Sequence, residues 1–61
     1  MKLQRWLTSN DVSPSAFAAR IGVTPRSVYR YLSGDTRPVP RIMVRIHAAT
    51  NGKVTASDFY P

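Results

Sequence analysis

Apolar residues recur along the chain at spacings of three and four positions, which is typical of amphipathic helices. In the first segment, from about Lys2 to Asn10, Leu3, Trp6 and Leu7 share one helix face. Three further segments repeat this pattern with Phe17, Ala18 and Ile21, then Val28, Tyr31 and Leu32, then Ile42, Met43, Ile46 and Ala49. Long alternating runs typical of strands are absent. The pattern therefore predicts an all-α fold.

Start and stop signals divide this pattern into separate helices. Ser13-Pro14 and Thr24-Pro25 each combine a good N-cap with a proline that suits the first helical position. Gly22 and Gly34 follow the last apolar positions and can adopt the left-handed conformation that ends a helix. These signals predict a second helix ending at Gly22 and a third from about 25 to 33. A loop over 35–39 then leads to a fourth helix over about 40–50.

The last ten residues carry weaker signals. Asn51-Gly52 follows a helical pattern, so we interpret it as a helix end and not as a hairpin turn. The sequence Thr55-Ala56-Ser57-Asp58 resembles a capping box with Asp in place of the usual Glu, and it predicts a final helical turn that carries Phe59. With 61 residues, the chain is long enough for one small domain of four helices and this terminal turn.

The short link between the second and third helices forces them to cross at a steep angle. At such a crossing the two backbones approach closely, so a small residue such as Ala18 is favoured at the contact. Gly22 permits the turn, Val23 can return to the core, and Val28 can pack against Ala18. This spacing predicts a helix-turn-helix over about 14–33. An ordinary helical hairpin remains the alternative.

Charge narrows the choice of partner. The chain has nine Lys and Arg against three Asp, a formal net charge of +6, and seven of the nine basic residues are Arg. Clustered arginine favours a polyanion, and an anionic membrane surface is a second possibility. The longest apolar run, 16–19, is far too short to span a membrane. The absence of cysteine excludes a disulfide framework.

The region from Ser13 to Pro38 resembles the helix-turn-helix of the lambda-type phage repressor and Cro superfamily. The matching stretches are Phe17-Ala18, Ile21-Gly22-Val23-Thr24, Ser27-Val28, Tyr31-Leu32-Ser33-Gly34 and Arg37-Pro38. The segment Arg45-Ile46 through Ala48-Ala49-Thr50 to Gly52 is also similar to short members of that family. The resemblance implies a five-helix fold, double-stranded DNA as the ligand and a homodimer on a palindromic site.

The third helix is expected to meet the base edges. Arg26 and Arg30 lie one turn apart and can donate two hydrogen bonds each to guanine. By the resemblance both occupy positions that commonly reach bases, although phosphate contact or simple solvation remains open. Tyr29 can pack on a thymine methyl group or donate to a phosphate, with an ordinary surface tyrosine as the alternative. Ser27 either touches DNA or caps its own helix. Pro25 stands where many relatives carry a polar side chain, so one typical base contact is expected to be missing.

Phosphate contacts are expected at helix N-termini and in the loop after the third helix. Ser13 and Ser15 begin the second helix and Thr24 begins the third, although all three can equally act as local caps. Arg37 lies in the loop, with pairing to Asp35 as its alternative, and Arg41 follows on the next helix.

These features predict a sequence-specific transcriptional regulator of bacterial or phage origin, acting in the cytoplasm on the nucleoid. The alternative is an antitoxin or co-regulator module whose main partner is a protein, and an RNA or membrane-surface binder is weaker still. No catalytic, metal, cofactor or small-molecule site is expected. A homodimer formed mainly on DNA would use the exposed side of the fourth helix together with Val54, Phe59 and Tyr60. Phe59 can equally belong to the core.

Overall fold

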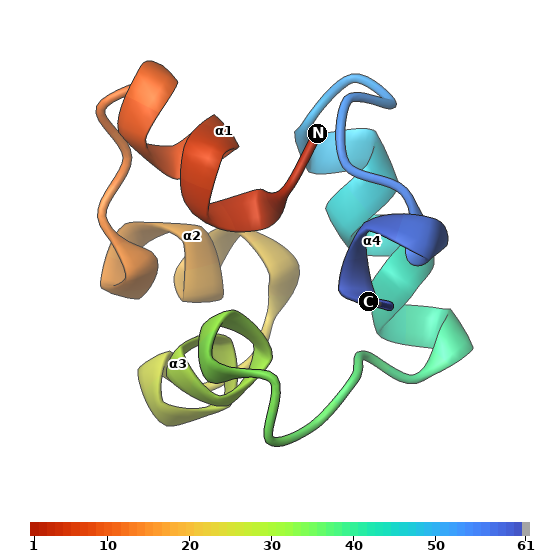
Figure 1. Ribbon diagram of the computed structural model, residues 1–61. Helices are drawn as coiled ribbons and strands as arrows, with labels where there is room; N and C mark the ends of the chain where they lie inside the picture. Colours follow the sequence, from red (N-terminus) through yellow and green to blue (C-terminus); the bar gives the residue numbers. More distant parts are fainter. Residues whose placement is uncertain (61) are drawn as a thin grey trace.

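A computed structural model describes residues 1–60 and shows an all-helical chain, as the pattern predicts (Figure 1). Each predicted helix is present, and the ends differ from expectation by one residue at most. The helices are α1 (Leu3–Ser9), α2 (Pro14–Ile21), α3 (Pro25–Ser33) and α4 (Pro40–Ala49), followed by the 3₁₀ turn η1 (Ala56–Phe59). Within residues 1–60, none of these helices is long and apolar enough to cross a membrane.

All four helices contribute to a single core. Trp6 and Phe17 form its aromatic centre, with ring centroids 5.6 Å apart and both side chains buried. The other buried apolar residues are Leu3, Leu7, Ala18, Ile21, Val28, Ile42, Ile46 and Val54. Four residues that the pattern assigned to the inner faces, Tyr31, Leu32, Met43 and Ala49, are only half-buried and pack against the edge of this core.

The corner between α2 and α3 has the predicted arrangement. Gly22 adopts a left-handed conformation with φ of 74°, and the backbone N–H groups of Gly22 and Val23 both donate to the Ala18 carbonyl. Ala18 and Val28 are both fully buried, and α2 packs against α3. A small residue therefore lies at the contact between the two helices.

Arg45 of α4 forms a hydrogen bond at this corner that the sequence analysis did not predict. Its Nη1 atom donates to the Ile21 carbonyl at 3.2 Å, at the end of α2. A Cβ atom added to Gly22 would lie 2.8 Å from that same nitrogen. Glycine at this position thus permits both the left-handed turn and the approach of Arg45.

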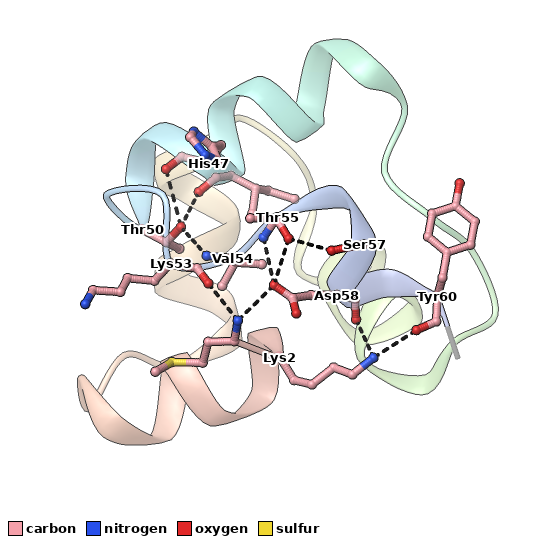
Figure 2. Close-up of polar contacts among 11 residues, drawn as sticks. Lys2, His47, Thr50, Lys53, Val54, Thr55, Ser57, Asp58 and Tyr60 are labelled. Carbon is pink, nitrogen blue, oxygen red and sulfur yellow. Dashed lines mark hydrogen bonds and ion pairs between the residues drawn. The ribbon is translucent and has the colours of Figure 1, made fainter.

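The expectation that Val54 helps to form a dimer is wrong, because its side chain is fully buried in the core. Asn51 and Gly52 both have positive φ and turn the chain back after α4. The buried Thr50 hydroxyl then donates to the Ile46 carbonyl at 2.9 Å and accepts the Val54 N–H at 3.1 Å. This link holds Val54 inward, and Figure 2 shows Thr50 between the two segments.

The start of the chain lies against η1 (Figure 2). The amino group of Met1 donates to the Lys53 carbonyl at 2.8 Å and pairs with Asp58 Oδ2 at 2.9 Å. Asp58 Oδ2 also accepts the Thr55 N–H at 2.9 Å, as expected of the capping-box variant. This backbone N–H, followed by the amino group of Met1, lowers the pKa of Asp58 below its ordinary value.

Candidate nucleic-acid interface

Helix α3 lies at the surface, and few of its side chains are buried. Val28 is its one fully buried residue, while Tyr31 and Leu32 face the edge of the core. The Thr24 hydroxyl accepts the Ser27 N–H at 3.2 Å and so caps the first turn, and Gly34 ends the helix with φ of 86°. These local signals fix both ends of α3 and leave a long face open to solvent.

The exposed face of α3 carries the residues that the sequence analysis assigned to base contacts. Arg26 and Arg30 are both exposed and lie about 6 Å apart along the helix axis, given a rise of about 1.5 Å per residue. The Tyr29 side chain is 56 % exposed. Pro25 is exposed in the first turn, and it offers no side-chain donor. Contact of these residues with bases stays a prediction.

Ser27 differs from the rest of this group. It is half-buried, and its hydroxyl lies 3.1 Å from the Thr24 hydroxyl, with either atom able to donate. Thr24 therefore has the local capping role that the sequence left open, and the Ser27 hydroxyl contacts this capping hydroxyl.

The arginines of α3 have no carboxylate partner in the described part of the chain. Across residues 1–60, the only ion pair is the one between the amino group of Met1 and Asp58. The other two acids, Asp11 and Asp35, are exposed. The positive charge of Arg26 and Arg30 is thus not neutralised within the described part of the chain, which leaves their guanidinium groups available to an anion.

The N-termini of α2 and α3 begin in the same way. Ser13 caps α2 by accepting the Ala16 N–H at 3.1 Å, and Thr24 caps α3 as described above. A hydroxyl that accepts one bond retains its own hydrogen for a further acceptor. Ser15 is exposed in the first turn of α2. Capping by Ser13 and Thr24 is thus compatible with a phosphate contact. Such a contact remains a prediction for these two residues and for Ser15.

Arg37 and Arg41 are both exposed, and within residues 1–60 only Arg37 makes side-chain contacts of the hydrogen-bond or cation–π kind. Arg37 Nε donates to the Phe59 carbonyl at 3.4 Å, and its guanidinium carbon lies 4.1 Å from the centre of the Tyr60 ring. The alternative of a pair between Arg37 and Asp35 is not seen. The stack on Tyr60 joins positions far apart in the sequence, so no local pattern indicated it.

The family model described as helix-turn-helix, of the lambda Cro and repressor type, matches residues 3–56. The chain belongs to this helix-turn-helix family. The match covers all four α-helices, so the resemblance seen in the sequence is confirmed. No curated protein and no solved structure gives a significant match.

The corner at Gly22 joins α2 and α3 as the sequence analysis predicted for the helix-turn-helix, in which α3 would be the second helix. The second helix is the one that such motifs place in the major groove, with its early residues against base edges. The family is one of DNA-binding domains and not of enzymes. The chain is accordingly a DNA-binding regulator of the lambda repressor type.

Proposed function

We propose that residues 1–61 act as one domain that binds a specific double-stranded DNA sequence and regulates transcription, with α3 in the major groove. The observation that carries this proposal is the exposed face of α3, where Arg26 and Arg30 lie one turn apart without a carboxylate partner among residues 1–60. A planar guanidinium can donate two parallel bonds to guanine, which gives sequence information that phosphate contacts lack. No catalytic role is assigned to any residue.

Phosphate contacts complete this proposal. Ser13, Ser15 and Thr24 lie at helix N-termini, and Arg37 and Arg41 add positive charge in the loop after α3 and at the start of α4. Counterion release then makes affinity fall with salt, with a log–log slope of about −0.9 for each neutralised phosphate. Such a regulator would work in the cytoplasm, on the nucleoid.

A homodimer on a palindromic operator is also part of the proposal. One recognition helix reads only a few base pairs, and a second copy related by a twofold axis doubles the footprint. Val54 is buried, and Phe59 packs against the core. In α4 and the last residues, the exposed apolar side chains that remain for a dimer contact are Val44, 69 % exposed, and Tyr60, 52 % exposed. A standard interface buries about 800 Å² per partner, about a fifth of the 4050 Å² surface of this chain. So large a share favours assembly on DNA over a stable free dimer.

Selection of bound duplexes from a random pool, followed by footprinting, tests these statements. We expect one enriched sequence with two inverted half-sites whose centres lie about 10–10.5 base pairs apart, or a multiple of that. Titrations of the selected duplex over a fourfold range of salt should show the steep loss of affinity described above. A pool without enrichment, or an affinity that ignores salt, would contradict the function, and a single unrepeated half-site would contradict the dimer.

The apolar surface near α4 also favours a second candidate, a module that binds a partner protein. Pro38, Met43, Val44 and His47 line a shallow hollow between α4 and η1, and none of them is acidic. Stable co-purification with one protein, together with weak and unspecific DNA binding, would favour an antitoxin or co-regulator over a regulator that acts through DNA alone.

A further inference from the structure

The contact between Arg37 and the end of the chain has no role yet in the folding or the function described above. Arg37 lies in the loop after α3, and Tyr60 follows η1. Arg37 contacts the Phe59 carbonyl, which lies 22 positions further along the chain. Both side chains are exposed, and the guanidinium carbon lies 4.1 Å from the ring centre. A surface arginine of this kind is normally mobile, and here it has a fixed support.

The backbone that carries the Tyr60 ring is held by contacts at Tyr60 and at its neighbour Phe59. Lys2 Nζ donates to the Asp58 carbonyl at 2.7 Å and to the Tyr60 carbonyl at 3.0 Å, as Figure 2 shows. The neighbouring Phe59 ring meets Tyr31 of α3 edge to face, with centroids 6.3 Å apart. The support beneath Arg37 is therefore anchored both to the start of the chain and to α3.

The stack leaves much of the guanidinium group unused. A guanidinium has five N–H donors, and its face can pack on an aromatic ring while its edge donates hydrogen bonds. Within residues 1–60, the recorded contacts occupy Nε and one face. The two Nη groups carry the other four donors, which suit a phosphate that approaches from the side.

The loop that carries Arg37 is attached to the last turn of α3. The Arg30 carbonyl accepts N–H groups from Gly34 and Asp35, at 3.1 Å each. A helix that lies in the major groove has a phosphate backbone on either side of it. A donor fixed just beyond the end of α3 is well placed to meet one of these backbones.

We propose that Tyr60 is a positioning residue that holds the Arg37 guanidinium ready for a DNA phosphate. This inference rests on the proposed function. Ordering a long side chain on binding lowers the affinity by about two- to tenfold. The stack on Tyr60 orders the Arg37 side chain already in the free protein, so this loss is avoided when DNA binds. Tyr60 thereby strengthens binding without touching DNA.

A double-mutant cycle on the full chain tests this proposal. The probe is a duplex with one selected half-site, so that only one protomer binds and contacts between copies play no part. We expect Tyr60→Ala to weaken binding about two- to tenfold and Tyr60→Phe, which keeps the ring, to bind as the wild type does. Arg37→Ala should reduce the salt slope by about 0.9, and adding Tyr60→Ala to it should have no further effect.

Arg5→Ala is the matched control. It removes the same charge from an exposed position on α1. In the Arg5→Ala background, Tyr60→Ala should therefore weaken DNA binding as much as it does in the wild type. Urea unfolding of each variant checks that the fold persists. In the free protein, nuclear magnetic resonance should show Arg37 side-chain protons shifted upfield by the ring in the wild type and Tyr60→Phe, and not in Tyr60→Ala.

Three results would overturn the proposal. Unchanged or tighter binding by Tyr60→Ala would mean that the stack does not assist Arg37, and an equal loss in the Arg37→Ala background would mean that Tyr60 acts by another route. An absence of the upfield shift in the wild type would remove the stack itself. Failure of the wild type to bind any duplex would instead overturn the proposed function, and the positioning role with it.

Discussion

Replacement of Gly22 by alanine tests how the corner of the helix-turn-helix is held. With φ of 74° at this position, an alanine must adopt a left-handed conformation, which costs about 1–2 kcal/mol. Its Cβ would also lie 2.8 Å from Arg45 Nη1. The end of a flexible side chain can move away at little cost, but it then loses its hydrogen bond to the Ile21 carbonyl. That loss adds about 0.5–1.5 kcal/mol.

Gly34 provides the matched control, because it has a similar φ of 86° and nothing within 4 Å of an added Cβ. Gly34→Ala should therefore cost only the backbone contribution, about 1–2 kcal/mol, while Gly22→Ala should cost about 1.5–3.5 kcal/mol. Urea unfolding followed by the fluorescence of Trp6, which is the single tryptophan and is buried, measures both values.

The Arg45→Ala background separates the two contributions. Without the Arg45 side chain, the cost of Gly22→Ala should fall to that of Gly34→Ala. If Gly22→Ala is no more destabilising than Gly34→Ala in the wild-type background, the contact between Arg45 and Ile21 contributes nothing measurable to the corner. If both alanine variants are as stable as the wild type, the argument from left-handed backbone fails as well.

Two further predictions concern the exposed arginines of α3 and the stability of the protein at low pH. Arg26→Ala and Arg30→Ala should each cost about 1–3 kcal/mol at a different base position, and selection repeated with each variant should show preference relaxed at that position alone. Equal losses on selected and random duplexes would identify both as phosphate contacts. Because the folded pKa of Asp58 is lowered, its contribution to stability is present above the unfolded pKa of about 3.9 and is lost as pH falls through the folded value. Asp58→Asn should therefore be less stable than the wild type at neutral pH and should lose less stability on acidification. Urea titrations at each pH measure both free energies of unfolding, and parallel dependences of these free energies on pH would contradict this reasoning.

Local signals in the sequence were enough to predict the helices and the corner. Ser13 and Thr24 act as caps through contacts only three residues away, and Gly22 and Gly34 end their helices through their own backbone conformation. Interactions this short depend on neighbouring residues alone, so the order of residues reveals them. The same holds for the exposed face of α3, whose position follows from helical periodicity once Val28 is assigned to the core.

The remaining features depend on contacts that cross the fold. No sequence signal distinguishes Thr50, yet its buried hydroxyl fixes Val54 in the core. Arg45 reaches back 24 positions to Ile21, and Arg37 reaches forward 22 positions to Phe59. Nothing in the spacing of these residues marks them, because each contact exists only after α4 and η1 have packed. Predicting them requires the tertiary arrangement first.

These contacts change what the net charge means. The formal charge of +6 treats all basic residues alike. In the folded chain, however, Arg45 is bonded to the end of α2, and Lys2 is bonded to the carbonyls of Asp58 and Tyr60. The guanidinium groups of Arg26 and Arg30, by contrast, have no ion-pair partner among residues 1–60. A basic residue that stabilises the fold contributes to the long-range field around the protein, whereas release of a condensed counterion requires close approach to a phosphate. The salt slope of DNA binding therefore reports the arginines that make no contacts within the fold, together with Arg37 if its stack on Tyr60 presents it to the DNA phosphate backbone. This slope should be smaller than the total number of basic residues suggests.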